Sequence, residues 1–330
     1  MHSGFPPFAA RWPWLGPDLQ TLRNAVAPPR CDLSTYRSER LILPLADRSG
    51  DRLAGLLQHP HGPPRPLVVL IHGLSGTEDS PYMLASAAAL LRGGYRVLRL
   101  NLRGAGASRP LCRLQYHAGR SADLRDALAA LDPALREPGL FLVGYSLGAN
   151  MLLKFLAEHG AGFPILAAAA VSAPLDLAAT SRRIQAPRNR FYQRHLLRHI
   201  KAESLDGSAA LNAEEQQCVR AARTIFQFDD RFVGPRNGYA GAAEYYADNS
   251  ADRFLAAIRV PTLVIHALDD PWIPSAAYER VAWADYPNLV PLLPDRGGHV
   301  GFHGRDSVVP WHDRCVGIFF AERGLDRPAV

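Results

Sequence analysis

The sequence predicts an α/β protein with a mostly parallel central sheet, helices on both faces and a helical insertion. Short apolar runs of strand length, such as residues 67–71 and 165–171, alternate with longer helical patterns, as in β-α-β units with right-handed crossovers. One such run, residues 140–143, leads straight into a glycine-flanked turn and a helix. At 330 residues with 48% hydrophobic residues, the chain suits a single large core. We therefore expect one domain over residues 1–330.

The elements follow in chain order. Residues 1–37 are expected to form an N-terminal arm, irregular up to about Pro29. Residues 40–45 and 53–59 alternate enough to open the sheet as an antiparallel pair. The chain then alternates between a strand at 67–71, a helix at 81–92, a strand at 95–100, a helix at 121–131, a strand at 140–143, a helix at 147–159 and a strand at 165–171. Further strands are expected near residues 260–266 and 289–293.

Between the strand at 165–171 and the strand near 260–266, the alternation of strands and helices stops. Residues 174–258 carry a helical pattern rich in Arg, His and aromatic residues. An insertion there would overhang the carboxyl ends of the strands, where ligands bind in open α/β sheets. Its aromatic residues could line an acyl pocket, although plain packing is the commoner role at helical spacing; they are Phe191, Tyr192, Phe226, Phe228, Phe232, Tyr239, Tyr245 and Tyr246.

The turn after residues 140–143 carries the strongest chemical signal. It reads Gly144-Tyr145-Ser146-Leu147-Gly148 between a strand and a helix, the layout of a nucleophile elbow. Such a reversal strains the backbone at the serine, and glycines two residues to either side remove side chains that would collide. The pattern predicts Ser146 as a nucleophile.

An acid and a histidine follow in the order that an α/β-hydrolase requires. Asp270 lies just past the strand at 260–266 and is the favoured acid, with its neighbour Asp269 as the alternative. His299 lies in a glycine-rich loop and is the favoured base. His303 competes with it but is expected on the surface or behind the site. A base that takes the serine proton and a carboxylate that holds the imidazole would complete a catalytic triad.

The developing oxyanion also needs preorganised donors. The backbone N–H of Leu147, at the start of the helix, is one candidate. The strand at residues 67–71 ends in His72-Gly73-Leu74, and the N–H of Leu74 is the second.

Several clusters along the chain resemble the YheT-like branch of the α/β-hydrolases, a group of esterases and lipid hydrolases. They are Leu19-Gln20-Thr21-Leu22, His72-Gly73-Leu74, Ser80-Pro81-Tyr82, Asn101-Leu102-Arg103-Gly104, Tyr116-His117-Ala118-Gly119, the elbow from Gly144 to Asn150, Phe228-Asp229-Asp230, Tyr245-Tyr246, Asp269-Asp270-Pro271 and Gly297-Gly298-His299-Val300-Gly301-Phe302. The resemblance implies the triad Ser146, Asp270 and His299. The chain departs from the family at Gly16-Pro17-Asp18, where an Asn-x-His is usual, so it does not define the role of the Leu-Gln-Thr element.

Composition excludes other classes. The net charge of +6 could suggest nucleic-acid binding, but the arginines are scattered among acids. The densest patch, residues 182–198, is expected to be a solvated helical face, with attraction to an anionic lipid surface as the alternative. The four cysteines form no C-x-x-C pair, so we expect a reducing cytoplasm and no zinc site or disulfide framework. The first residues lack the basic stretch and apolar run typical of a signal peptide, and no uninterrupted apolar segment reaches about 18 residues, so we expect no transmembrane segment.

We expect neither a metal nor a cofactor. Asp229-Asp230 lacks further ligands at metal spacing, and His195 and His199 lack the glutamate of H-E-x-x-H. The sequence predicts a cytoplasmic serine carboxylesterase for a small-molecule ester with a short or medium acyl chain, which could be derived from a lipid. Alternatives are an acyltransferase that passes the acyl group to an alcohol and a non-catalytic binding protein. The acyl length, the alcohol and the oligomeric state are not encoded in the motifs.

Overall fold

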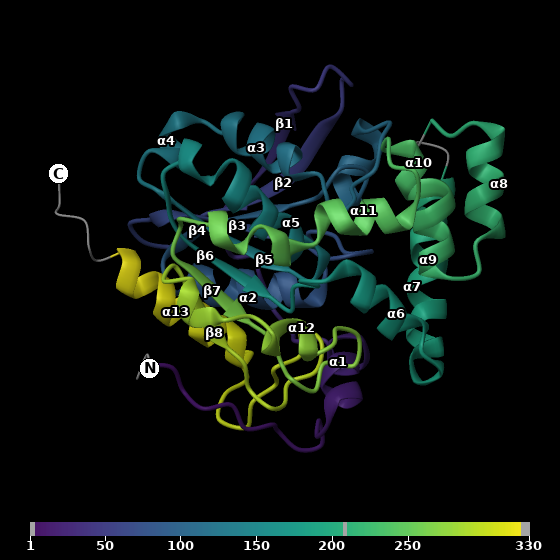
Figure 1. Cartoon of the computed structure of the whole chain (residues 1–330). Coiled ribbons are helices and arrows are strands. Elements are labelled where there is room, and N and C mark those ends of the chain that lie inside the picture. The colour runs from purple at the N-terminus through teal and green to yellow at the C-terminus, as the bar shows by residue number, and fades with distance from the viewer. Residues whose placement is uncertain (1–3, 207–209, 325–330) are drawn as a thin grey trace.

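Eight strands form one sheet in the order β1-β2-β4-β3-β5-β6-β7-β8 (Figure 1). The computed structural model describes residues 4–206 and 210–324, so parts of the expected arm (1–3), insertion (207–209) and domain end (325–330) lie outside the described residues. The strands are β1 (Ser38–Pro44), β2 (Arg52–Gln58), β3 (Arg65–Ile71), β4 (Tyr95–Leu100), β5 (Leu140–Tyr145), β6 (Ile165–Val171), β7 (Thr262–Ile265) and β8 (Leu289–Leu292). β1 and β2 are antiparallel, as are β2 and β4, and all other neighbours are parallel.

Helices cover both faces of this sheet and form a separate layer at one side of it. The helices are α1 (Pro17–Val26), α2 (Pro81–Arg92), α3 (Ser121–Ala129), α4 (Pro133–Arg136), α5 (Leu147–Glu158), α6 (Leu177–Gln185), α7 (Arg190–Leu205), α8 (Ala213–Ala221), α9 (Ile225–Phe228), α10 (Gly234–Arg236), α11 (Ala242–Asn249), α12 (Ala276–Glu279) and α13 (Trp311–Gly324). α3 and α5 pack on one face of the sheet, and α2 and α13 pack on the other. The fold class expected from the sequence is confirmed.

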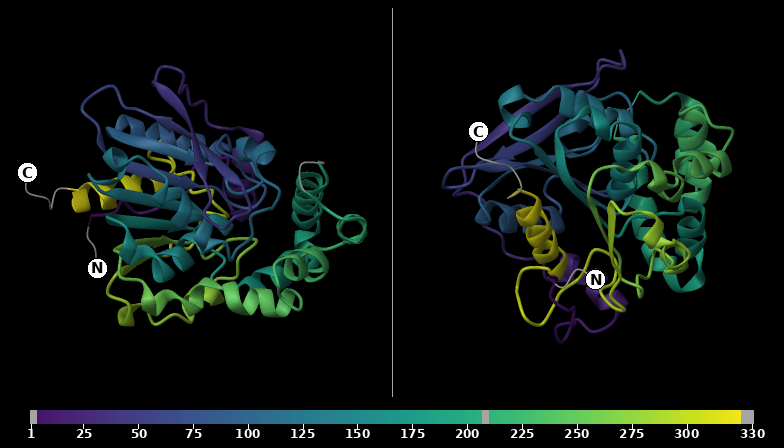
Figure 2. Two further views of the ribbon diagram at one scale, coloured as in Figure 1. Left: turned by 90° about the horizontal axis from the view of Figure 1, so that it is seen from above. Right: turned by 60° about the vertical axis from the view of Figure 1, so that its left-hand side comes forward.

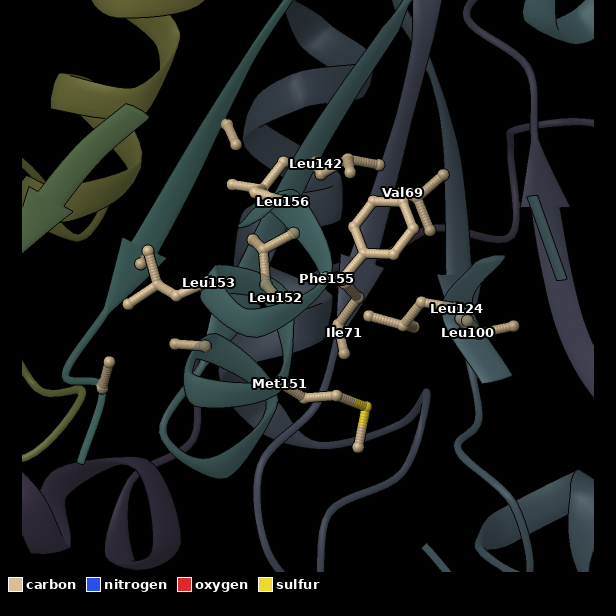
Figure 3. Close-up of a cluster of buried hydrophobic side chains, with 14 of the residues drawn as sticks. Val69, Ile71, Leu100, Leu124, Leu142, Met151, Leu152, Leu153, Phe155 and Leu156 are labelled. Carbon is tan, nitrogen blue, oxygen red and sulfur yellow. The ribbon is translucent and has the colours of Figure 1, made fainter. Parts of the chain in front are cut away.

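The parallel strands are buried on both faces, so their alternate residues enter two different cores. Leu67, Val69 and Ile71 of β3 pack with α5, whereas Val68 and Leu70 pack with α2 and α13. Figure 3 shows the first of these cores, where the side chains of α5 meet those of the central strands. This burial on both sides explains why the strands read as continuous apolar runs in the sequence.

Helices α6 to α11 follow β6 and precede β7, and we refer to them as the cap. Figure 2 shows these helices extending away from the sheet on the side opposite to α13. They cover the carboxyl ends of the parallel strands, because residues that follow β3, β5, β6 and β7 line the same cavity as the cap helices. The arginines of α6 and α7 are exposed, as expected for a solvated face.

One expectation about the N-terminal arm is wrong. The stretch up to Pro29 is not irregular throughout, since residues 17–26 form α1 with Pro17 in its first turn. Its apolar residues do not mark a buried face: Gln20 is the buried residue of this helix, while Leu19 and Leu22 are exposed. A surface helix usually turns its apolar stripe toward the core, whereas α1 turns a polar residue inward and its leucines outward.

The contact between β5, α5 and the end of β3 yields a prediction. A Cβ at Gly148 would lie 2.3 Å from the His72 carbonyl oxygen and 2.7 Å from that of Ile71. Backbone atoms at the end of a central strand cannot shift to admit a methyl group without a large loss of stability. Gly148→Ala should therefore lower the free energy of unfolding by roughly 2 kcal/mol or more. Urea denaturation measures this loss.

Gly317→Ala is the matched control. Gly317 lies within α13, and no atom lies within 4 Å of the position that a Cβ would take there. Alanine is the better helix former, so this variant should be neutral or slightly more stable. Equal effects of the two substitutions would contradict the close contact at Gly148.

Candidate active site

Ser146 lies at the sharp turn between β5 and α5. Its φ of 52° and ψ of −122° lie outside the regions that side-chain-bearing residues favour. Such a conformation persists only where the surroundings hold it. Gly73 provides part of that room, because a Cβ there would lie 2.9 Å from the Ser146 Cβ. A Cβ at Gly144 would likewise meet Ala149 Cα at 2.7 Å, so the turn is packed on both sides.

The structure brings Ser146, His299 and Asp270 together from three loops. His299 Nε2 lies 2.9 Å from Ser146 Oγ, and His299 Nδ1 lies 2.8 Å from Asp270 Oδ2. His299 is buried, and the ring of Trp272 packs against it with 4.3 Å between centroids. The three side chains form one continuous chain of hydrogen bonds.

The two neighbouring aspartates have different partners. Asp270 Oδ1 accepts hydrogen bonds from the backbone N–H groups of Trp272 and Ile273, at 2.8 and 3.0 Å. Burial alone would raise the pKa of Asp270, but His299, His266 and the Ile273 N–H bring that pKa below its usual value, which keeps the carboxylate charged. Asp269 instead accepts a hydrogen bond from the Gly298 N–H at 2.9 Å, so it braces the loop of the histidine.

His303, the alternative base, is not the histidine that bonds the serine. It is buried, and burial lowers the pKa of its imidazole to about 3. Its backbone N–H donates to Gln20 Oε1 at 2.7 Å, and its carbonyl accepts from Gln20 Nε2 at 3.1 Å. The backbone of His303, and not its ring, therefore makes the hydrogen bonds with Gln20.

Helix α1 holds the loop that carries His299. In addition to the two hydrogen bonds between Gln20 and His303, Thr21 Oγ1 accepts from the His299 N–H at 2.9 Å, and Asn24 Nδ2 donates to the Val300 carbonyl at 3.2 Å. The helix also packs so closely that a Cβ at Gly298 would lie 2.5 Å from the Pro17 carbonyl oxygen. The Leu-Gln-Thr element, whose role the sequence left open, thus contacts the histidine loop directly.

The loop after β3 holds Leu74 next to the serine. Tyr82 Oη accepts from the Gly73 N–H at 3.0 Å, and Tyr116 Oη accepts from the Ser75 N–H at 2.7 Å, so the two phenols support the residues on either side of Leu74. Among the described residues, the N–H groups of Leu74 and Leu147 have no hydrogen-bond acceptor. Both are therefore free to receive an oxyanion.

His72 completes the support of this loop. Its Nε2 accepts from the Leu102 N–H at 3.0 Å, which leaves Nδ1 to donate to the Gly73 carbonyl at 2.8 Å. Burial lowers the pKa of His72 to about 4, so the ring is neutral near pH 7. Motif reasoning did not assign roles to His72, Tyr82 and Tyr116, although each lies in a cluster of the family resemblance.

A cavity of about 330 Å³ opens between the serine and the cap. Most of its lining is apolar, and the cap contributes Leu177, Ile184, Leu196, Ile200, Ile225, Phe228, Phe232, Tyr245 and Tyr246. Phe191, Tyr192, Phe226 and Tyr239, which were also considered for the pocket, do not line it.

Two carboxyl groups of the cap also border the cavity. Burial raises the pKa of Asp229 to about 7, and Tyr246 Oη donates to its Oδ2 at 2.6 Å. Burial likewise raises the pKa of Glu203 to about 7, and Tyr116 donates to Glu203 Oε2 at 3.4 Å. Near neutral pH, both groups are therefore partly protonated.

Other features considered from the sequence do not assemble a metal site in the structure. Over residues 4–206 and 210–324, no group of three or more His, Cys, Asp or Glu side chains is placed to hold a metal ion. His195 and His199 lie with their rings 4.2 Å apart, and His199 Nδ1 bonds the His195 carbonyl. Asp230 Oδ1 accepts from the Ala242 N–H at 3.0 Å, which is a bond within the cap.

One class of protein combines such an elbow, its hydrogen-bonded partners and a cap. Comparison of this chain with known proteins identifies that class directly. A family model described as "alpha/beta hydrolase fold" matches residues 66–306. The chain belongs to this family, and within it to the YheT-like branch. It is 35% identical over 252 residues to the Escherichia coli (strain K12) protein named "Putative esterase YheT", covering 74% of this chain and 73% of that protein.

Two further relatives extend the comparison. The medium-chain fatty acid ethyl ester synthase/esterase 2 of Saccharomyces cerevisiae is 29% identical over 286 residues, which cover 78% of this chain and 62% of the yeast protein. The chain thus spans less than two thirds of that relative. The solved structure of the Pyrococcus furiosus esterase Pf2001 has a TM-score of 0.56 at 19% identity and covers 89% of this chain and 96% of that one, which shows the shared fold. These comparisons support an esterase-type hydrolase.

In the part of the chain that the structure describes, no helix has both the length and the apolar character to cross a membrane. The cytoplasmic location expected from the cysteines stays a prediction.

The contact of α1 with the histidine loop can be tested at Thr21. Thr21→Val keeps the shape but removes the acceptor of the His299 N–H, so kcat for ester turnover should fall by about tenfold or more with a smaller change in KM. The rate at which a fluorophosphonate labels Ser146 should fall in parallel. Thr21→Ser, which keeps the hydroxyl, should restore both; a Thr21→Val enzyme with lower stability but unchanged kcat would show that the contact is only structural.

The raised pKa of Asp229 predicts a dependence of stability on pH. Its pKa is about 7 in the folded chain against 3.8 ordinarily, so between these values the folded state holds the proton more often than the unfolded state. The Asp229 contribution to the free energy of unfolding therefore falls as pH rises across that window. Asp229→Asn removes this contribution, so the variant should gain stability relative to wild type between about pH 4 and about pH 8, by a few kcal/mol at most. Urea unfolding at both pH values measures the difference in the free energy of unfolding between the variant and wild type. A difference that is the same at both would contradict this prediction.

Proposed function

We propose that this protein is a serine carboxylic ester hydrolase that acts on esters with short or medium acyl chains through an acyl-Ser146 intermediate. The observation that carries the proposal is the hydrogen-bonded chain from Ser146 Oγ through His299 to Asp270, beside two unpaired N–H groups. Hydroxyl, imidazole and carboxylate in this sequence of contacts can activate a serine for attack on a carbonyl carbon.

The first half of the reaction forms the acyl-enzyme. As Ser146 Oγ attacks the ester carbonyl carbon, His299 Nε2 takes the hydroxyl proton, and Asp270 stabilises the resulting imidazolium through Nδ1–H. The carbonyl oxygen becomes an oxyanion that accepts hydrogen bonds from the N–H groups of Leu74 and Leu147. Collapse of this intermediate breaks the bond to the alkoxy group, which leaves as the alcohol with the proton from Nε2.

Water resolves the acyl-enzyme in the second half. It attacks the acyl carbon while giving a proton to His299 Nε2, and the same two N–H groups receive the second oxyanion. Collapse returns the proton to Ser146 Oγ and releases the carboxylic acid. No step requires a metal or a cofactor.

The cavity supports the proposed substrate class. At about 330 Å³ it lies near the lower end of ligand pockets, and apolar cap residues such as Ile184, Leu196 and Phe228 line it. An acyl chain buries its methylene groups favourably in such surroundings. The size favours a short or medium chain over a long one, and the medium-chain fatty acid ester in the name of the yeast relative is consistent with a lipid-derived ester.

An acyltransferase is the second candidate. The yeast relative is named as both an ethyl ester synthase and an esterase, and the same acyl-enzyme can pass its acyl group to an alcohol if the cap restricts water. The two functions share every residue of the first half-reaction, so only the products separate them.

Substitutions in the hydrogen-bonded chain test the proposed mechanism. Ser146→Ala should abolish turnover of p-nitrophenyl esters, and retained turnover would remove the assignment. Asp270→Asn should lower kcat by about ten-thousandfold, because the imidazole loses the carboxylate that orients and stabilises it. Asp269→Asn is the matched control. The Asp269 carboxylate bonds the Gly298 N–H and not the His299 ring, so this substitution should lower kcat far less. Equal losses would overturn the choice of Asp270 as the acid.

A panel of esters from acetyl to palmitoyl tests the proposed chain length. We expect kcat/KM to rise from acetyl to medium chains, as more apolar surface is buried, and to fall for palmitoyl, which exceeds the cavity. Product analysis with ethanol present gives the acceptor: free acid supports the hydrolase, whereas ethyl ester as the main product would support the acyltransferase.

A further inference from the structure

Helix α1 faces the protein with its polar side and solvent with its apolar side. Three polar side chains of the helix, Gln20, Thr21 and Asn24, bind the histidine loop. Leu19 and Leu22 are exposed, and Val26 is 70% exposed. These three residues are spaced at 3 and 4 positions along the helix, so they form a continuous stripe. An ordinary surface helix buries such a stripe against its own core.

The apolar stripe continues beyond α1 in both chain and space. Trp12 is 79% exposed, and Leu15 is also exposed. The start of the cap lies beside the helix, because Arg188 and Tyr192 both bond the Asp18 carboxylate, at 2.8 and 3.0 Å. In this neighbouring segment, Phe191 is 72% exposed. We define the outer apolar surface as Trp12, Leu15, Leu19, Leu22, Val26 and Phe191.

Positive charge borders this surface. Residues 177–202 hold six arginines and one lysine and no acidic residue. The six arginines are exposed: they are Arg182, Arg183, Arg188, Arg190, Arg194 and Arg198. Arg188 pairs with Asp18, and the structure gives the other five no salt bridge to any described acid. This segment therefore presents a cationic face next to the exposed apolar side chains.

The same elements border the catalytic cavity. Thr21, Asn24 and Ala25 of α1 line it, and so do Ile184 of α6 and Leu196 of α7. Figure 1 shows α1 and the start of the cap on the same side of the molecule. A partner seated on the outer apolar surface would therefore lie close to the route into the cavity.

We propose that the outer apolar surface and the cationic face dock together on an anionic lipid surface, from which the cavity takes its ester. This inference deepens the proposed function, because it requires a lipid-derived ester as substrate. Apolar side chains including Trp, flanked by arginines, are the pattern of an interfacial helix that inserts shallowly among lipid head groups. Anionic head groups attract the arginines.

A second copy of the chain fits this surface less well. In a two-fold symmetric dimer the same patch occurs on both subunits, so the arginines of one copy would face those of the other. Like charges across an interface oppose association. An anionic surface has the opposite charge and meets the arginines without this penalty.

Co-sedimentation of the purified full chain with vesicles tests the proposal. Wild type should bind vesicles of equal parts phosphatidylcholine and phosphatidylglycerol, bind phosphatidylcholine alone weakly, and release with added salt. The triple variant Leu19→Ser, Leu22→Ser and Val26→Ser should lower the partition coefficient by about tenfold or more. The double variant Arg190→Ser and Arg194→Ser should lower binding to the anionic vesicles and weaken its salt dependence. Ile42→Ser on β1, also an exposed apolar residue, is the matched control and should bind as wild type does.

Turnover of p-nitrophenyl acetate in solution separates this proposal from the proposed function. The triple variant should keep wild-type turnover of this soluble ester, which also shows that α1 still holds the histidine loop, and Ser146→Ala should still bind vesicles. Failure of wild type to bind anionic vesicles would overturn the docking surface while leaving the esterase proposal intact. A wild-type dimer that the triple variant dissociates in sedimentation equilibrium would also overturn it, since a second copy would then cover the surface.

Discussion

The close contact between the β5–α5 turn and the end of β3 is the constraint on which the site depends. Gly148 lies against the carbonyls of Ile71 and His72, so the first turn of α5 touches the strand that leads into the Leu74 loop. Ser146 has a positive φ at this contact, and Leu74 and Leu147 both line the cavity beside it. The strain at Ser146 is maintained by packing of the sheet core beneath it.

The two loops around Ser146 that carry His299 and Leu74 are supported by residues from other parts of the chain. The histidine loop depends on α1, which is more than 270 positions away in the chain, and the Leu74 loop depends on the phenols of Tyr82 and Tyr116. One helix therefore has two different faces: its polar face binds the histidine loop, and its apolar face is exposed. The proposed docking surface and the support of His299 would then be two sides of the same element.

Local patterns predicted most of the fold. The strands β4 and β6 and the helix α2 have the bounds expected from the sequence. For the strands, burial on both faces makes the apolar runs continuous. Helix α1 escaped this reasoning because its contacts with the protein are polar. Hydrophobic periodicity indicates which side of a helix is buried only when the burial is apolar.

The sequence by itself determined the residue types and their order: a serine between two glycines, then aspartates, then a histidine in a glycine-rich loop. These follow from local geometry, since an elbow needs small residues at fixed spacing. Only the tertiary structure decided that Asp270 and not Asp269 contacts His299, that Gln20 and Thr21 bind its loop, and how large the cavity is. Each of these depends on contacts between segments far apart in the chain, which spacing along the chain does not encode.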